Sequence, residues 1–253
     1  MKSSFFEIRP DILVVYNNPI LFLKDINSIV IADLHLGVEA IMQEEGSFVP
    51  HNLTSQIIGD LSNYLKELKP DRLILNGDVK HSFYQPTKIE NRDVKKFLKE
   101  ISKLVPEVHI IKGNHDVFIS WVAQEFSNVI VHSHKRFGRY YFVHGDKELE
   151  EKLDVDTELI IIGHLHPVLE SRVKGLQKIR KPAFMFGPLK NQTQFVIVMP
   201  AFTQYSTGSP IHPNSKTHHI VPLLRENADL REFELYVLDE KETFHFPKLK
   251  LWM

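Results

Sequence analysis

No cysteine occurs among the 253 residues of this sequence. Disulfide bonds, iron–sulfur clusters and cysteine-ligated zinc sites are therefore excluded. Any metal ion must be held by histidine, by side-chain oxygen of Asp, Glu or Asn, or by backbone oxygen. Those ligands suit manganese, iron, zinc or magnesium better than copper(I).

The sequence also lacks an excess of either charge, with 31 Lys and Arg against 32 Asp and Glu. This balance excludes a globally basic nucleic-acid binder but permits a local basic patch. Long apolar runs are missing too, since the longest, 159–162 and 195–199, are far too short to cross a bilayer. The first residues do not read as a signal peptide. We therefore expect a cytoplasmic protein with no membrane partner.

Two signatures of other ester and phosphate chemistry are absent. The sequence has no Gly-x-Ser-x-Gly nucleophile elbow and no Walker-type phosphate loop. Catalysis through a Ser, Cys or Lys nucleophile therefore has no support in this chain.

The composition that remains is ordinary for a globular protein, with 43% hydrophobic and 25% charged residues. No repeat, low-complexity tract or flexible linker interrupts it. A chain of this length fits one large domain, so we expect a single domain over residues 1–253.

Short β-branched runs alternate with helical patterns through the first two thirds of the chain. Helices are predicted between Pro50 and Pro70 and over about residues 91–104, where apolar residues recur at three- and four-residue spacing. This alternation predicts an α/β layered architecture. The strands predicted here are 12–15, 28–32, 72–75, 108–111, 129–131, 140–143 and 159–162.

From residue 183 onward the pattern changes to strands joined by turns. The predicted strands are 183–186, 194–199, 219–222 and 233–238. We expect residues 183–253 to add antiparallel strands that complete a second sheet packed against the first. The tail, 243–253, is predicted to be an edge strand, with a docking peptide as the alternative.

Five predicted strands run directly into short groups of Asp, Asn or His, most of them with an adjacent glycine. Strand ends in an α/β sheet carry loops that form ligand sites, and glycine allows close backbone approach. An isolated Asp-x-His or Gly-Asp is more often a surface group or a turn, but five such groups in one context are hard to obtain from turns. We therefore predict a centre for one or two hydrolytic divalent metals. The groups are Asp33-Leu34-His35, Asn76-Gly77-Asp78, Gly113-Asn114-His115-Asp116, His144-Gly145-Asp146 and Gly163-His164-Leu165-His166.

In this order the five groups resemble the motifs of the calcineurin-type metallophosphoesterase superfamily, over roughly residues 28–167. More narrowly, segments 32–40, 76–81 and 199–202 are similar to the ICC-like branch, which includes bacterial ligase-associated phosphoesterases thought to act in DNA repair. The resemblance implies an α/β fold of four layers (αββα), in which helices flank a two-sheet β-sandwich.

The resemblance also implies two divalent metal ions, manganese first, with iron, zinc or magnesium as alternatives. It assigns Asp33, His35, Asp78 and His166 to the first metal, and Asp78, Asn114, His144 and His164 to the second. A shared carboxylate, Asp78, relieves the repulsion between two cations about 3.5 Å apart. The nucleophile implied is a hydroxide that bridges the metals, with no covalent phosphoenzyme.

Beside these ligands, the resemblance makes His115 the group that protonates the leaving oxygen or stabilises the pentacoordinate phosphate. Many members of the superfamily orient this histidine with an Asp that follows the second motif, and that Asp is missing from Val79-Lys80-His81. Asp116 is the candidate to replace it as a second catalytic residue, unless another acid does so or His115 works unaided.

Two basic segments adjoin the ligand-bearing ones. Residues 172–181 carry five positive charges and no acid, and Lys135, Arg136 and Arg139 precede His144. We predict that Arg172, Lys174 and Arg136 contact substrate, because a basic rim suits a polyanion such as DNA or RNA. A solvated basic face is the alternative.

Three functions remain open on these grounds. The first is a metal-dependent phosphodiesterase or nuclease acting on DNA, RNA or nucleotides. The second is a phosphomonoesterase acting on nucleotides or phosphoproteins with the same metals. The third is a non-catalytic scaffold that recruits a DNA-repair helicase or ligase, which seven costly polar ligands at one place argue against. The oligomeric state is not indicated.

Overall fold

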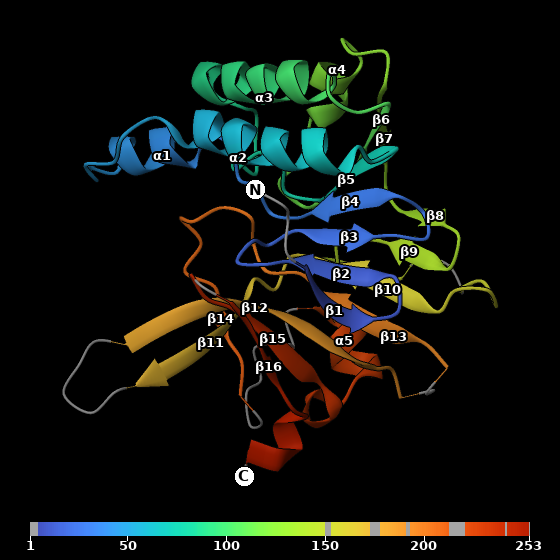
Figure 1. The fold of residues 1–253 in the computed structure, drawn as a ribbon. Coiled ribbons are helices and arrows are strands. Elements are labelled where there is room, and N and C mark those ends of the chain that lie inside the picture. The colour runs from blue at the N-terminus through green and yellow to red at the C-terminus, as the bar shows by residue number, and fades with distance from the viewer. Residues whose placement is uncertain are drawn as a thin grey trace.

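The computed structural model describes residues 5–149, 153–172, 178–190, 193–212, 221–240 and 242–252. Two mixed β-sheets pack face to face, and helices cover their outer faces (Figure 1). The predicted α/β fold with a two-sheet sandwich is confirmed. Among the described residues, no helix combines the length and the apolar character that a membrane span requires.

The first sheet has seven strands in chain order, antiparallel from β1 to β4 and parallel from β4 to β7. Parallel pairing places the carboxyl ends of β4, β5 and β6 at one edge. The strands are β1 Phe5–Arg9, β2 Ile12–Val15, β3 Leu21–Leu23, β4 Ser28–Ile31, β5 Arg72–Asn76, β6 Glu107–Ile111 and β7 Val129–His132.

The second sheet has nine strands along the order β14-β11-β12-β13-β10-β9-β8, with β15 paired to β12 and β16 at the edge. Strands β9, β10 and β13 are parallel, whereas β12, β15 and β16 pair antiparallel. The strands are β8 Lys135–Phe137, β9 Tyr140–Phe142, β10 Leu159–Ile162, β11 Pro167–Arg172, β12 Lys178–Pro188, β13 Phe195–Val198, β14 Ser209–Pro210, β15 Glu234–Leu238 and β16 Thr243–Phe246.

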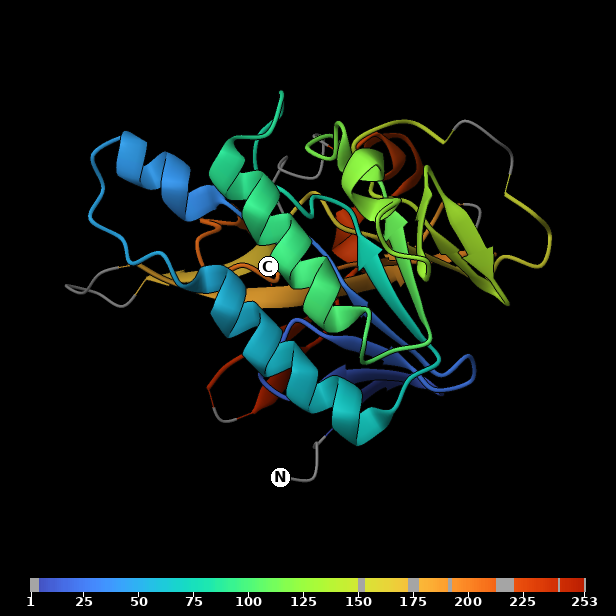
Figure 2. The same cartoon turned by 90° about the horizontal axis from the view of Figure 1, so that it is seen from above.

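Helices α2 and α3 lie side by side across the outer face of the first sheet, as the view from above shows (Figure 2). Helix α2, Leu53–Leu68, buries Ile57 and Leu61 against that sheet and ends at Lys69, which adopts a φ of 47° before Pro70. Helix α3, Lys88–Ile101, begins after Thr87, whose hydroxyl accepts a hydrogen bond from the Glu90 backbone N–H. The apolar faces predicted from the sequence therefore pack these two helices against the first sheet as its outer layer.

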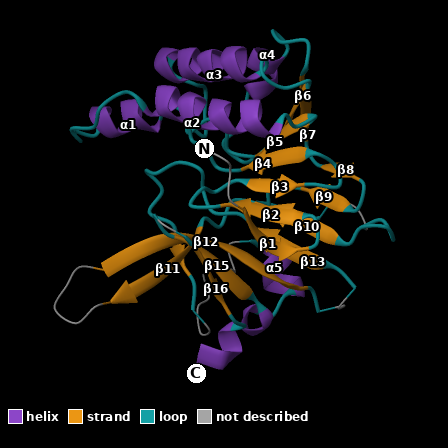
Figure 3. Ribbon diagram, viewed as in Figure 1, coloured by secondary structure: helices purple, strands orange, loops and turns teal. Residues whose placement is uncertain are grey.

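The other helices are short (Figure 3). They are α1 Val38–Glu44, α4 Ile119–Ala123, α5 Pro222–Asn227 and the 3₁₀ turns Leu230–Glu232 and Leu249–Trp252. Leu223 and Leu224 of α5 pack on the outer face of the second sheet. The predicted strand 219–222 is wrong where it is described, because Pro222 starts α5: proline supplies no backbone N–H to a strand but is accommodated in the first turn of a helix.

The apolar layer between the sheets is closed at the site end by a polar side chain, Asn76. Its Nδ2 donates to the backbone carbonyls of Ile161 at 3.0 Å and Val143 at 3.3 Å, both in the second sheet or directly after it. Asn76 is fully buried, so it ties the two sheets together behind the ligand-bearing loops.

Replacing Asn76 by leucine is expected to lower the free energy of unfolding by about 1–3 kcal/mol, because it removes the donor to two buried carbonyls. Urea denaturation followed by circular dichroism measures the change. Asn63→Leu, on the exposed side of α2, is the matched control and should stay within about 0.5 kcal/mol. An unchanged midpoint in Asn76→Leu would show that this link between the sheets is not stabilising.

Candidate metal centre

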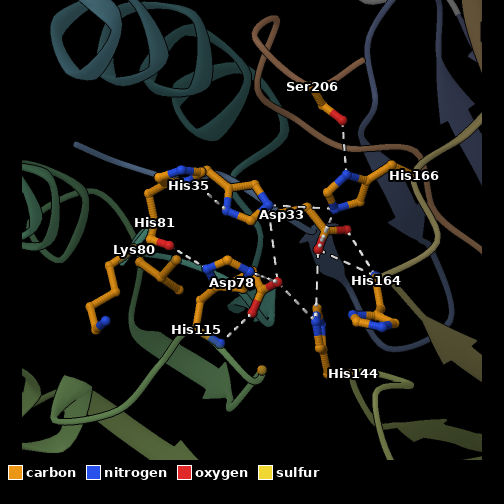
Figure 4. A network of polar contacts seen from close by, with 12 residues as sticks. Asp33, His35, Asp78, Lys80, His81, His115, His144, His164, His166 and Ser206 are labelled. Carbon is orange, nitrogen blue, oxygen red and sulfur yellow. Dashed lines mark hydrogen bonds and ion pairs between the residues drawn. The ribbon is translucent and has the colours of Figure 1, made fainter. Parts of the chain in front are cut away.

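Six of the seven predicted ligands come together where loops from both sheets meet (Figure 4): Asp33, His35, Asp78, His144, His164 and His166. Backbone hydrogen bonds join the loops: the Asp33 N–H donates to the Gly77 carbonyl at 3.0 Å, and the Gly163 N–H donates to the His144 carbonyl at 2.9 Å. A Cβ on Gly163 would lie 2.6 Å from Asp33 Oδ2, so glycine is needed for the two sheets to approach this closely.

Five residues of the cluster have left-handed backbone conformations that ordinary side chains rarely adopt. Each such residue costs roughly 1–3 kcal/mol and persists where surrounding structure or function requires it. The geometry turns successive side chains at a strand end towards a common point. The five are Asp33 (φ 57°), His35 (φ 48°), Asp78 (φ 51°), His164 (φ 63°) and His166 (φ 49°).

One group of potential metal ligands consists of Asp33, His35 and His166, whose ligand atoms all lie within 4.8 Å of one another. His166 Nε2 is 3.1 Å from Asp33 Oδ1, and the Nε2 atoms of His35 and His166 are 3.5 Å apart. This group can hold one divalent ion.

A second group consists of Asp78, His144 and His164, within the same 4.8 Å limit. Asp78 Oδ2 is 3.2 Å from His144 Nε2 and 4.0 Å from His35 Nε2 of the first group. One carboxylate oxygen therefore lies between the two groups, which is the position a bridging ligand must occupy.

Asn114 lies beside Asp78. A Cβ on the preceding Gly113 would come within 2.1 Å of Asp78 Oδ1, and the following residue, His115, donates its backbone N–H to the same oxygen at 3.0 Å. The Oδ1 atom of Asn114 is buried and has no hydrogen-bond partner within the described part of the chain. The seventh predicted ligand thus has an unsatisfied acceptor next to the second group.

The outer nitrogens of two histidines are held by neighbouring groups. His144 Nδ1 lies 3.0 Å from the Asn76 carbonyl, to which it donates, and His166 Nδ1 lies 2.8 Å from Ser206 Oγ. Such contacts orient a metal-binding imidazole and leave its Nε2 lone pair for the ion.

Burial and mutual charge shift the pKa values in this cluster strongly. Burial lowers the pKa of His35 to about 3, despite the opposing charges of Asp33 and Asp78. For His144, burial acts in the same direction, but Asp78 and Asp33 outweigh it and raise the pKa to about 10. Burial alone would raise the pKa values of both carboxyls, yet the neighbouring histidines hold them below the usual range. The buried carboxylates therefore require positive charge close by.

These residues fit a pair of divalent cations. His144 Nε2 is fully buried and, although 3.2 Å from Asp78 Oδ2, it makes no hydrogen bond of acceptable geometry to any residue that the structure describes. A buried nitrogen without a hydrogen-bond partner is costly, and a cation between this nitrogen, the carboxylate and the amide oxygen would satisfy all three.

His115 lies at the border of this centre, and its ring nitrogen Nδ1 is held by a backbone carbonyl. Its Nδ1 contacts the backbone carbonyl of His81, and its Nε2 is 3.7 Å from Asp78 Oδ2. Phe83 covers the ring at a centroid distance of 3.7 Å. His35, His81 and His115 also form a third group that could hold an ion.

The carboxylate of Asp116 contacts backbone N–H groups, whereas a partner of His115 would have to contact its imidazole ring. Its carboxylate is fully buried and accepts backbone hydrogen bonds from Val79 at 2.9 Å, Lys80 at 3.3 Å and Gly113 at 2.9 Å. Burial and the charge of Asp78 raise its pKa to about 6. Asp116 thus joins the loops that carry Asp78 and Asn114, while a carbonyl faces His115.

The predicted substrate-binding cations are paired with acidic side chains where the structure describes them. Arg136, on β8, pairs with Asp154 at 3.2 Å and Asp156 at 3.9 Å. The side chain of Arg172 and all of Lys174 lie outside the described residues. Further along the same basic segment, Lys178 and Arg180 both pair with Glu170, at 3.2 and 3.0 Å. Acidic neighbours therefore offset much of the positive charge that is described.

The supporting roles of three residues were not predicted: Asn76, which was named only as part of a strand-end group, Ser206 and Glu90. Asn76 precedes Gly77-Asp78 at a strand end, so its position gave a usable signal. Ser206 is 40 residues from its partner His166, and Glu90, buried on α3, accepts the backbone N–H groups of His81 and Ser82. Neither contact has a local sequence signature.

Comparison with known proteins adds a family and a fold. A family model described as calcineurin-like phosphoesterase matches residues 26–180. The structure of the nuclease MPE from Pseudomonas putida is similar, with a TM-score of 0.63 and 19% identity over 93% of this chain and 96% of that one. A protein of unknown function from Aquifex aeolicus, AQ665, matches with a TM-score of 0.37 and 20% identity over 55% of this chain and 78% of that one. No curated protein matches.

Proposed function

This chain belongs to the calcineurin-like phosphoesterase family of metal-dependent phosphoric ester hydrolases, and on that premise we propose that it is a dinuclear phosphodiesterase acting on nucleic acids or nucleotides. The observation that carries the proposal is the pair of ligand groups on either side of Asp78 Oδ2.

In this proposal Asp33, His35 and His166 would hold one ion, His144, His164 and Asn114 would hold the other, and Asp78 would serve both. Two divalent ions bound there would supply positive charge for the phosphate oxygens and would lower the pKa of water. Histidine, carboxylate and amide ligands suit manganese, iron, zinc and magnesium alike. Manganese is the first candidate, and the other three are the alternatives.

The protein's own part in the reaction is to place and protonate the ester. Because His115 Nδ1 donates to the His81 carbonyl, the ring is fixed with Nε2 towards Asp78 and the centre. From there Nε2 can give a proton to the leaving oxygen, a step that contributes about 10²–10⁴-fold to turnover. Phe83 shields one face of the ring from water.

The choice of diesters over monoesters has two supports. A protein with the same fold over 93% of this chain is a nuclease. In addition, an apolar and aromatic cavity lies beside Asn114, where a group attached to the second ester oxygen can be accommodated. A monoester lacks such a group.

A panel of substrates with added Mn²⁺ tests the proposal. We expect release of p-nitrophenol from bis-p-nitrophenyl phosphate to exceed that from p-nitrophenyl phosphate, and cleavage of DNA or RNA that weakens as salt is added. Chelation should abolish both. A preference for the monoester, insensitive to salt, would instead identify a phosphomonoesterase, and no hydrolysis in a protein without bound metal would favour the scaffold hypothesis.

A further inference from the structure

A cavity of about 370 Å³ opens beside the proposed metal centre. Three segments line it: the loop after β6, the turn between β7 and β8, and β9 with the loop that follows it. Its volume lies at the lower end of the range for small-molecule sites.

The cavity adjoins the centre on the side of the second ligand group. Asn114, a proposed ligand, is part of its wall. Val143 and Asp146, which flank the proposed ligand His144 in the chain, line it as well. A phosphate held at the centre would therefore have one of its ester groups directed at this cavity.

The walls are mainly apolar and include aromatic surface. Val117, Phe118 and Leu149 supply apolar surface. Tyr141 also lines the cavity, although only 8% of its surface is exposed. His134 stacks on Tyr141 with ring centroids 5.5 Å apart and planes at 21°. His134 therefore covers much of the Tyr141 ring, and the aromatic rings left to a ligand are those of His134 and Phe118. Such rings suit a planar ligand, because nucleobases of any kind stack on aromatic side chains.

The charges in the cavity are balanced, which argues against a second phosphate as occupant. Lys112 and Lys147 are matched by Asp146 and Glu148, and Glu148 also lies 3.6 Å from the Arg225 guanidinium. A site for polyphosphate would carry an excess of cations. Hydrogen-bond donors and acceptors around an apolar cavity surface fit a neutral ring with polar edges.

We propose that this cavity binds the nucleoside attached to the scissile phosphate, so that the base lies against the wall formed by His134, Phe118 and Val117. The inference rests on the proposed phosphodiesterase function and assigns the place where the nucleoside part of its substrate is held. Lys112 and Asp146 are placed to contact the sugar or the polar edge of the base.

Three diesters that release p-nitrophenol separate this inference from the proposed function: the p-nitrophenyl esters of thymidine 5′-phosphate, ethyl phosphate and phenyl phosphate. With the Mn²⁺-loaded wild type, kcat/KM for the thymidine ester should exceed that for the ethyl ester by about 10-fold, as stacking on an aromatic wall provides. The phenyl ester should fall between them, because it stacks but has no polar edge.

Val117→Trp fills the cavity from the loop after β6, where Val117 is 40% exposed. It is expected to reduce the thymidine-to-ethyl ratio to about one. Ser133→Trp, from the opposite wall, should do the same. Ile130→Trp, on an exposed position of β7 outside the cavity, is the matched control and should keep the wild-type ratio.

Calorimetric titration of the Mn²⁺-loaded protein with thymidine supplies a second readout that needs no turnover. Wild type and Ile130→Trp should bind thymidine, and Val117→Trp should not. An unchanged ratio and unchanged binding in both cavity variants would overturn the inference, as would a phenyl ester hydrolysed as well as the thymidine ester. Failure of all three esters to react would refute the phosphodiesterase proposal, and the titration would still decide whether the cavity binds a nucleoside.

Discussion

Asp78→Asn is expected to lose both metal ions together and, with them, phosphodiesterase activity. Asp78 Oδ2 lies 3.2 Å from His144 Nε2 and 4.0 Å from His35 Nε2, so it faces both ligand groups. Asparagine keeps the shape of the side chain but removes the negative charge that offsets two cations. Removing a group that only orients a metal ligand already lowers metal affinity or activity by about 10–100-fold, and the loss of a shared ligand should lower them further.

Metal content after equilibration with Mn²⁺ and gel filtration measures this effect directly, with circular dichroism to show that the fold is retained. Asp60→Asn, at an exposed position of α2, is the matched control and should keep two equivalents of metal. Retention of one equivalent by Asp78→Asn would mean that Asp78 serves a single ion. Retention of two would contradict the bridging role altogether.

His115→Ala should show the opposite pattern: intact metal content and turnover lower by about 10²–10⁴-fold. The physical reason is that His115 Nε2 reaches the edge of the centre while its Nδ1 is held by the His81 carbonyl. The loss should depend on the leaving group. It should be large for a nucleoside alcohol, which needs a proton to depart, and small for p-nitrophenol, which does not.

Two further variants make this result specific. His245→Ala, on edge strand β16, is the matched control and should retain wild-type turnover. His81→Ala keeps the backbone carbonyl that contacts His115, so it should retain most activity and both metals. If His115→Ala and His81→Ala each lost metal, the group of His35, His81 and His115 would be an ion site and His115 a ligand.

Much of the fold was predictable because its signals are local. Strands β2 and β10 were predicted with the bounds they have, and α2 lies between the two prolines that were expected to limit it. The predicted strand 219–222 was wrong at its described end, where Pro222 begins α5. Strand β14 and helix α4 were missed: the two residues of β14 are too few to alternate, and the five residues of α4 complete little more than one helical turn.

The candidate site was predictable for a similar reason. Each ligand type stands directly after an apolar strand, so Asp33, Asp78 and His144 could be recognised one loop at a time. The surroundings were not, because they depend on contacts between distant segments. The carboxylate of Asp116 is directed to three backbone N–H groups, and Glu90 reaches across from α3 to hold the loop of His81.

The sequence by itself determined the chemistry available to this protein: no thiolate, no phosphate loop, and seven candidate nitrogen and oxygen ligands placed where predicted strands end. These follow from composition and from patterns a few residues long. Only the tertiary structure decided which atoms face one another, namely Asp78 Oδ2 between two ligand groups, a backbone carbonyl behind His115, and an aromatic cavity beside Asn114. Those relations arise when two sheets pack, and packing joins residues that no local pattern connects.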